Sequence, residues 1–359
     1  MIIQKKTALT FGTAACVGLA AASGAMAQAT PGEGTSIQMA QPTWDTGWFH
    51  TEIYVQLLEE LGYEMEETMT LDNPIFYQSV VFGDVTMWVD GWFPLHNTYR
   101  DSFKGSAEIV GAVAEGGALE GYLIDKASAE EFDITTLEDF KRDEVKEAFD
   151  RNGDGRADMV ACPPGWGCEI NIEHHLDAYD LRDHINPIKA GYSASMADAV
   201  ASYGAGDPIL FYTWTPNWTV NELVPGEDVV WIEVPEVDLP ESLAGMSDAA
   251  TMEGVEGCVS DPCTLGFPAS DIVSVVNTAF LDDNPAVRTL LESASIPLSA
   301  VFAQNAAMNA GDDDIEAQAA AWIEDNRTDV DGWLEAARDA HSNRAPVPPA
   351  GVKARRWTT

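Results

Sequence analysis

The hydrophobic and polar positions of this chain switch repeatedly between helical and strand periodicity. Helical periodicity is clearest over residues 49–61, where the apolar positions share one face and Gly62 follows. Further helices are predicted over residues 75–82, 137–149 (behind a capping-box pattern at Thr135 to Glu138), 169–181 and 194–203. Strands are predicted over residues 36–40, 85–89, 159–162, 209–212, 229–234 and 271–276. Strands that alternate with helices predict α/β layers, with a ligand bound beyond the carboxyl ends of the strands.

The last third of the chain is mostly helical. Helical patterns run from residue 285 to residue 340 and include Trp322 and Trp333, whereas the proline-rich residues 342–359 are predicted to be a disordered tail. A helical segment so late in the chain can pack back on the first part of the fold. With 46% hydrophobic residues and moderate charge, the chain can bury substantial cores and is predicted to form two lobes.

The N-terminus has the pattern of a secretory signal peptide. Lys5 and Lys6 precede an apolar run over residues 7–22, and the small-residue site Ala25-Met26-Ala27 predicts cleavage before Gln28. No later apolar stretch approaches the 18 or so residues that a membrane span requires. The mature protein is therefore expected outside the inner membrane, in the periplasm if the cell has two membranes.

The cysteines outside the leader form an even set. Cys16 lies within the apolar run, but the residues before it lack the leucine of a lipobox, so a lipid anchor is not expected. An oxidising compartment favours disulfides among the other four, and we expect neighbours to pair, Cys162 with Cys168 and Cys258 with Cys263. The spacings within these pairs fit a zinc site poorly.

The charge of the chain is strongly negative. The formal net charge is −40 and becomes more negative once the lysines of the leader are removed. Such a surface excludes nucleic acid as a natural partner and repels anionic substrates, whereas it suits a cationic or zwitterionic ligand. Acidity of this kind is also typical of proteins that stay soluble in saline surroundings, and that reading says nothing about the ligand.

Three tryptophans lie in contexts that do not resemble helical core. Trp166 is in the short loop Cys162-Pro163-Pro164-Gly165-Trp166-Gly167-Cys168, and Trp92 and Trp214 lie at predicted strand ends. Three indoles around one cavity would suit a quaternary ammonium group, because its spread positive charge is attracted to aromatic faces. By contrast, Trp231, Trp322 and Trp333 are interpreted as core residues.

Several segments resemble the periplasmic glycine betaine and proline betaine binding proteins of osmoprotective ABC importers. The likeness covers nearly all of the mature chain, and its most specific parts are Gly121 to Lys126, Asp150 to Asp158, Cys162 to Glu169, Tyr212 to Pro216, Asp228 to Trp231, Gly266 to Pro268 and Ala303 to Ala306.

The resemblance implies a two-lobed binding protein that closes on its ligand by hinge motion. It implies a discontinuous lobe 1, residues 28–119 and 266–341, and a lobe 2, residues 120–265, joined by two crossover strands near Glu120 and Gly266. A monomer that delivers its ligand to an ABC permease, without a cofactor and without catalysis, is expected.

The resemblance also implies which residues bind the ligand. Trp92, Trp166 and Trp214 would form the aromatic box around the trimethylammonium group, while His96 and the amides of Gly167 and Cys168 would hold the ligand carboxylate. A carboxylate that enters a nonpolar site needs such donors, because its desolvation is costly.

The chain departs from this family pattern around residues 43–48 and at Asp90. Trp44 and Trp48 stand where small polar residues are expected, so these three side chains are candidates for additional cleft residues. An extra indole or acid would favour choline, carnitine or dimethylsulfoniopropionate over glycine betaine.

The residues Asp150 to Asp158 match the first nine positions of a calcium loop. The candidate ligands are Asp150, Asn152, Asp154, Arg156 and Asp158, with glycine at position six. The twelfth position is Ala161 rather than a glutamate, so an ordinary turn is the alternative.

Two further readings concern catalysis and metal binding. A secreted calcium-stabilised hydrolase is the remote functional alternative, although no nucleophile motif is present. His174 and His175 are interpreted as surface residues, because adjacent helical side chains point about 100° apart.

Overall fold

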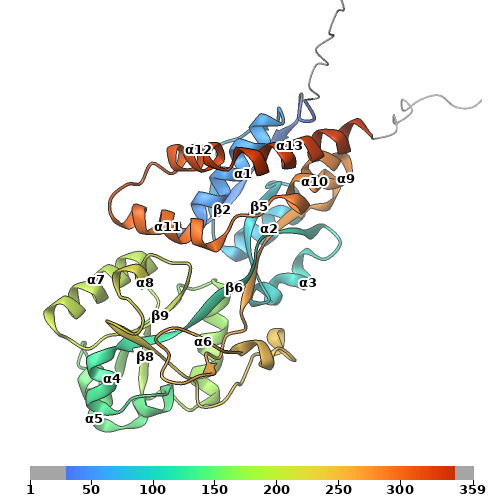
Figure 1. Cartoon of the computed structure of the whole chain (residues 1–359). Coiled ribbons are helices and arrows are strands. Elements are labelled where there is room, and N and C mark those ends of the chain that lie inside the picture. Colours follow the sequence, from blue (N-terminus) through green and yellow to red (C-terminus); the bar gives the residue numbers. More distant parts are fainter. Residues whose placement is uncertain (1–29, 344–359) are drawn as a thin grey trace, which may run out of the picture.

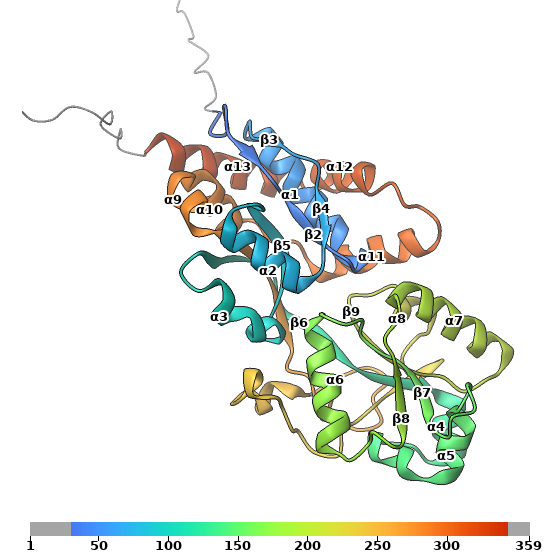
Figure 2. The same ribbon diagram turned by 180° about the vertical axis from the view of Figure 1, so that it is seen from behind.

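The structure, a computed structural model, describes residues 30–343. The predicted signal peptide and residues 344–359 of the predicted tail lie outside the described residues. Figures 1 and 2 show two lobes, one built from both ends of the described chain and one from its middle. The predicted α/β class is confirmed, and the mixed architecture agrees with a two-lobed binding protein.

Lobe 1, the upper lobe in Figure 1, is a small sheet system covered by helices from both ends of the described chain. Its strands are β1 (Ser36–Ile37), β2 (Ala40–Pro42), β3 (Glu64–Met65), β4 (Met69–Leu71), β5 (Met87–Phe93) and β13 (Ser270–Asn277). Its longer helices are α1 (Trp48–Glu60), α2 (Asn73–Phe82), α10 (Pro285–Ser293), α11 (Leu298–Asn309), α12 (Ile315–Asp325) and α13 (Arg327–Ser342). Short helices are η1 (Asp45–Gly47), η2 (Leu95–Tyr99), α3 (Arg100–Phe103) and α9 (Thr278–Asp283). The late helices pack on the first ones, as α12 does on α1, so the expected return of the C-terminal segment is confirmed.

Lobe 2 has a central sheet with helices around it (Figure 2). Its strands are β7 (Ala157–Val160), β8 (Ile185–Ile188), β9 (Leu210–Thr215), β10 (Val229–Ile232), β11 (Thr251–Met252) and β12 (Cys263–Thr264). Its helices are α4 (Lys126–Phe132), η3 (Leu137–Lys141), α5 (Asp143–Phe149), α6 (Gly167–Ala178), α7 (Tyr192–Ala205), α8 (Thr219–Glu222), η4 (Glu241–Leu243) and η5 (Ser247–Ala250). β7 pairs in parallel with β8 and β9, so their carboxyl ends lie on the same edge of the sheet.

One long strand, β6 (Ala107–Asp125), runs through both lobes. Its first part pairs with β13 of lobe 1, and its second part pairs antiparallel with β9 and β10 of lobe 2. Glu120, where the first crossing is predicted, lies in the second part opposite Trp214. The second connection reaches β13 from lobe 2 just after Gly266. The expected lobe boundaries near Glu120 and Gly266 stay a prediction, and the two segments that join the lobes are β6 and the chain between β12 and β13.

Several predicted elements have different bounds in the structure. The predicted helix 137–149 is a 3₁₀ turn, η3, followed by α5, and its capping box joins Thr136 and Asp139 instead of the predicted pair. Periodicity does not predict the strand β6, because its many alanines and glycines hide the pattern, and only the family resemblance implies a crossover strand near Glu120.

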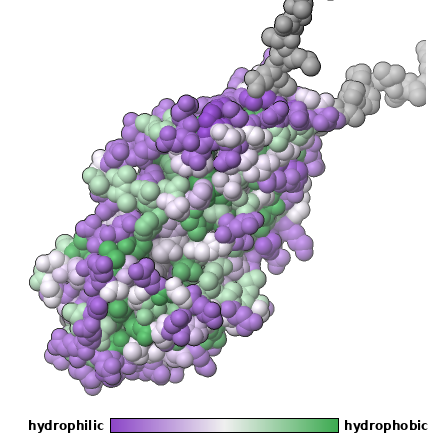
Figure 3. Space-filling model, in the orientation of Figure 1, coloured by the Kyte–Doolittle hydropathy of each residue, from purple (hydrophilic) through white to green (hydrophobic). Residues whose placement is uncertain are grey.

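Both expected disulfides form in the structure, Cys162 with Cys168 and Cys258 with Cys263. The first closes the loop that leads from β7 into α6, and the second staples the segment between β11 and β12. In Figure 3 hydrophilic residues cover the outer ends of both lobes, and hydrophobic residues gather between these ends. Within residues 30–343 no single helix is long and apolar enough to span a membrane, and α10 and α11 would meet that criterion only as a pair bent by 87°.

The fold makes one glycine of β6 indispensable. Gly111 has φ +66°, and a Cβ there would lie 1.8 Å from the carbonyl oxygen of Leu291 in α10. We expect Gly111→Ala to lower the unfolding free energy by about 2 kcal/mol or more, because both the left-handed backbone and the steric overlap oppose it.

A matched control is Gly332→Ala in α13, where a Cβ would meet nothing within 4 Å. This change should stabilise the protein by up to ~1 kcal/mol through helix propensity. Equilibrium denaturation of both variants checks the prediction, which fails if Gly111→Ala unfolds at the same denaturant concentration as the wild type.

Candidate functional site

A small cavity lies between the two lobes. Its ten lining residues are Trp44, Trp92, Leu95, His96, Glu120, Trp166, Gly167, Cys168, Tyr212 and Trp214. All four tryptophans follow or end strands, namely β2, β5, β7 and β9, so the strand ends bring them together as the α/β pattern predicts. Each is no more than 6% exposed, and the cavity is therefore shielded from solvent.

The indoles form the walls of the cavity. The ring of Trp166 lies 5.1 Å from that of Trp44 and 5.7 Å from that of Trp214, at interplanar angles of 72° and 73°. Edge-to-face contacts of this kind are favourable aromatic packing. We name the four side chains Trp44, Trp92, Trp166 and Trp214 the indole cage. A cage of aromatic faces is suited to a methylated cation.

Asp90 supports the cage from behind. Its carboxylate is fully buried and accepts the indole N–H of Trp44 at 2.6 Å and that of Trp92 at 2.9 Å. His50 Nε2 lies 3.2 Å from the same carboxylate. Asp90 therefore does not line the cavity but fixes two of its walls.

Two neighbours of Asp90 complete this arrangement. A Cβ at Gly47 would lie 2.0 Å from Asp90 Oδ2, so only glycine leaves room for the carboxylate. Trp48 does not line the cavity either, because its indole N–H donates to the Pro42 carbonyl at 2.8 Å. Of the three additional candidates, the structure thus places only Trp44 in the cavity wall.

The other two cage indoles bind across the cleft. The N–H of Trp166 donates to the Thr43 hydroxyl at 3.0 Å, and that of Trp214 donates to the Thr46 hydroxyl at 3.3 Å. The Tyr99 hydroxyl also donates to the Gly165 carbonyl at 2.7 Å. The structure is therefore a closed form, in which lobe 1 contacts the cage residues of lobe 2.

His96 lines the cavity, but both of its ring nitrogens contact lobe 1. Nδ1 accepts the main-chain N–H of Trp92 at 3.2 Å and lies 2.9 Å from the Tyr77 hydroxyl, while Nε2 lies 3.0 Å from the Asn73 amide. Burial lowers the pKa of His96 to about 3, so the ring is neutral at physiological pH. This histidine brings no positive charge to the cavity.

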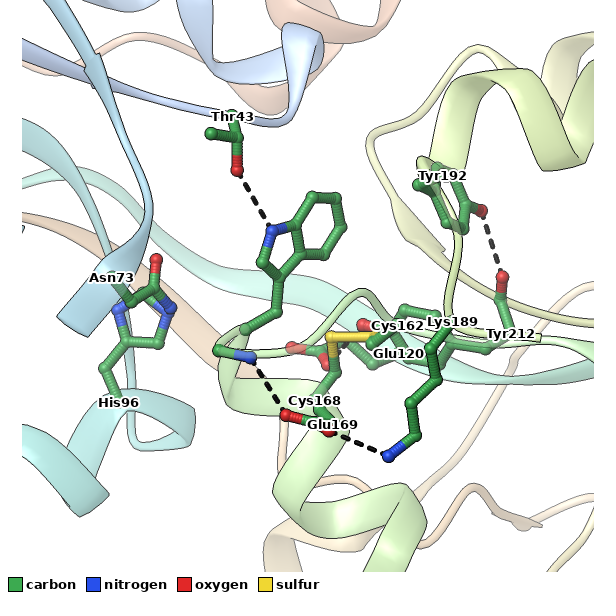
Figure 4. Close-up of a disulfide and its surroundings, with 12 residues drawn as sticks. Thr43, Asn73, His96, Glu120, Cys162, Cys168, Glu169, Lys189, Tyr192 and Tyr212 are labelled. Carbon is green, nitrogen blue, oxygen red and sulfur yellow. Dashed lines mark hydrogen bonds and ion pairs between the residues drawn. A yellow bond between two sulfur atoms is a disulfide. The ribbon is translucent and has the colours of Figure 1, made fainter. Parts of the chain in front are cut away.

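Gly167 and Cys168 lie at the first positions of α6, with their backbone at the cavity wall. The first amides of a helix have no acceptor within the helix and favour negatively polarised groups. Figure 4 shows the Cys162–Cys168 disulfide beside Glu120 and Tyr212, with Thr43 and His96 approaching from lobe 1. The disulfide holds the start of α6 at the cavity.

Glu120 is a cavity residue that the sequence analysis identified only as a crossover position. Its carboxyl is 1% exposed, and Oε2 accepts the Tyr212 hydroxyl at 2.7 Å. Burial raises the pKa of Glu120 to about 8, and the hydrogen bond from Tyr212 opposes that shift. An acid inside the apolar run Leu119 to Ile124 is the signal that points to it.

The calcium-loop residues are occupied by hydrogen bonds from the protein. Asp150 accepts the amides of Gly153 and Gly155, and Asp158 accepts the amide of Asn152 and the side chain of Asn186. Residues 30–343 contain no group of three or more His, Cys, Asp or Glu side chains placed to hold a metal ion. Calcium binding at this loop stays a prediction.

The interpretation of His175 as a surface residue is wrong. Its ring is fully buried, and Nδ1 lies 2.8 Å from the Tyr122 hydroxyl. The apolar face of α6 turns it into lobe 2, whereas His174 stays partly exposed beside Asp238. Trp231 is a core residue, as predicted. Trp322 and Trp333 are partly buried and pack against the hydrophobic core.

Solved structures share this fold at low sequence identity. The closed form of lactococcal OpuAC with glycine betaine matches with a TM-score of 0.63 and 19% identity, covering 84% of this chain and 99% of that one. A choline binding protein in complex with choline matches with a TM-score of 0.64 and 19% identity, covering 86% and 96%. The two-lobed binding-protein fold is therefore shared with both.

Curated relatives are more similar in sequence. The glycine betaine-binding periplasmic protein OusX of Dickeya dadantii (strain 3937) is 37% identical over 314 residues, which is 86% of this chain and 92% of OusX. The glycine betaine/proline betaine-binding periplasmic protein of Escherichia coli (strain K12) is 36% identical over 311 residues, 86% of this chain and 91% of the relative. Residues 35–325 match the family model described as the substrate binding domain of the ABC-type glycine betaine transport system, and the chain belongs to this family of transport binding proteins.

Proposed function

We propose that this protein captures glycine betaine or a related quaternary ammonium osmolyte outside the inner membrane and presents it to the permease of an ABC importer. The observation that carries the proposal is the enclosed indole cage between the lobes. A methylated cation gains from contact with aromatic faces and needs no hydrogen-bond acceptor when it is buried. Membership of the family supports the class of ligand and the permease partner.

Residues from both lobes carry out the binding. Trp92 and Trp44 of lobe 1 and Trp166 and Trp214 of lobe 2 surround the cation. Where the ligand carries an oxygen, the amides of Gly167 and Cys168 are donors at the cavity wall. His96 stays proposed as a ligand contact on the ground of the family resemblance.

Closure makes the binding selective. When the lobes meet, the hydroxyls of Thr43 and Thr46 accept the indole N–H groups of lobe 2, which turns the ring faces toward the cavity. Exclusion of water then strengthens the attraction between the cation and the rings, because the surroundings are less polar. The closed form is the one that a permease would distinguish from the open, empty form.

The location and the remaining partners follow from the same proposal. Residues 1–27 act as the export signal, and the relatives bear the name of periplasmic proteins. We infer a monomer that performs no covalent chemistry, in place of the hydrolase alternative. A calcium ion at Asp150 to Asp158 would stabilise lobe 2 without contacting the ligand.

Removal of one cage wall should weaken binding and leave the fold intact. We expect Trp166→Ala to weaken the binding of the preferred trimethylammonium ligand at least tenfold, since a desolvated cation–π contact is worth about 2 kcal/mol or more and tenfold corresponds to about 1.4 kcal/mol. Titration calorimetry measures the change, and circular dichroism checks the fold.

The control for this variant is Trp322→Ala, which removes an indole that stacks on Trp333 outside the cavity. It should bind as the wild type does. Equal affinity of Trp166→Ala and wild type would contradict the role of the cage.

Closure can be tested at Gly167, where a Cβ would lie 2.9 Å from His96 Cδ2 and 2.9 Å from Leu95 Cγ of lobe 1. We expect Gly167→Ala to hold the lobes apart and to weaken ligand binding about tenfold or more, with little change in the melting temperature of the ligand-free protein.

The matched control is Gly191→Ala at the start of α7, where a Cβ would meet nothing within 4 Å. Small-angle scattering with saturating ligand reports closure directly. A Gly167→Ala protein as compact as the wild type, with unchanged affinity, would refute this role of the glycine.

A further inference from the structure

The side chain of Glu120 has one oxygen that the protein leaves unpaired. Oε2 accepts the hydroxyl of Tyr212, whereas Oε1 is buried and has no hydrogen-bond partner among the described residues. Glu120 lines the cavity together with the indole cage. Buried polar atoms in native proteins nearly always have a partner, and an exception at a binding site points to a ligand group as that partner.

The cavity offers no cationic side chain to a ligand carboxylate. None of its ten lining residues is a lysine or an arginine, and His96 is neutral with both ring nitrogens in contact with lobe 1. The amides of Gly167 and Cys168 are the donors that the backbone supplies. A ligand carboxylate in this space would lie near the carboxyl group of Glu120, and no cationic side chain would compensate the repulsion between the two acids.

The ammonium group of the ligand is attracted by Glu120, whereas a ligand carboxylate is repelled. A carboxyl group beside a buried cation supplies the counter-charge that the rings lack. Trp44, the extra indole of the chain, completes the enclosure on the lobe 1 side and leaves a compact space. The site therefore combines four indole faces and one acid, a set that fits a small cation with little else attached.

We propose that Glu120 is a specificity-determining residue, which makes the cavity prefer trimethylated ammonium ligands whose second polar group is a single oxygen, a hydroxyl or an N-oxide, over ligands that carry a carboxylate. This inference rests on the proposed function and narrows it. A ligand hydroxyl donates to Oε1 of the ionised carboxylate, whereas an N-oxide oxygen accepts the proton of the neutral acid. Both ligands complete the hydrogen bonding of Oε1.

The test compares the affinities of four probes for the full mature protein by titration calorimetry at pH 7. Choline and trimethylamine N-oxide are the single-oxygen probes, glycine betaine carries the carboxylate, and tetramethylammonium carries no oxygen. We expect choline or trimethylamine N-oxide to bind at least tenfold more tightly than glycine betaine. The tighter of the two identifies whether Glu120 accepts or donates.

The variant Glu120→Gln keeps the size of the side chain and removes its charge. It should reduce the preference for choline over glycine betaine at least tenfold, because the amide neither attracts the ammonium group nor repels the ligand carboxylate, although it can still donate a hydrogen bond to an N-oxide. The control is Glu169→Gln beside the same disulfide loop, where the carboxylate pairs with Lys189 at 2.8 Å and does not line the cavity. This variant should leave the order and ratio of affinities unchanged.

The outcomes separate this inference from the function on which it rests. Tighter binding of glycine betaine than of both single-oxygen probes by the wild type overturns the inference, even if Glu120→Gln does not fold. An unchanged ratio of choline affinity to glycine betaine affinity in a folded Glu120→Gln protein also overturns it. If none of the four probes binds, the proposed capture of quaternary ammonium osmolytes fails as well.

Discussion

Every indole N–H of the cage must find an acceptor outside the cavity, and the architecture of the site depends on this requirement. A buried indole N–H without a partner is costly, so the position of its acceptor decides which way the ring faces. Trp44 and Trp92 are satisfied within lobe 1 by Asp90. Trp166 and Trp214 are satisfied only across the cleft, by Thr43 and Thr46. One half of the cage is thus built in advance, and the other half acquires its acceptors when the lobes close.

Two buried acids near the cage have different roles because their surroundings differ. Asp90 lies against Gly47, and each of its oxygens accepts one indole N–H group. Glu120 receives one hydroxyl and keeps one oxygen for the cavity, and burial raises its pKa to about 8. Burial with few donors favours the neutral form of Glu120. Asp90 therefore orients the rings, whereas one oxygen of Glu120 is left to interact with a ligand.

The sequence predicts the frame of the molecule better than its site. Alternating strands and helices, the late helical segment and the pairing of neighbouring cysteines can be read from local patterns, since periodicity and spacing determine them. The strand β6 escapes detection because Gly111, Gly116 and Gly117 interrupt its pattern. Trp44 and Trp48 look equivalent in sequence, yet η1 and α1 turn only Trp44 to the cavity. Long-range packing, which no local pattern encodes, separates the two.

The location of Glu120 explains why a crossover strand is an effective place for a ligand contact. β6 pairs with β13 in one lobe and with β9 in the other, so its backbone is held on both sides of the hinge region. In the proposed hinge motion, a carboxyl attached there would stay between the lobes, whereas the indoles of lobe 2 would reach their acceptors in lobe 1 on closure. A cation that enters the open cleft can therefore meet an acid and the preformed half of the cage first. Closure then adds the remaining rings, and the ligand is buried only when its charge and its oxygen match the groups already in place.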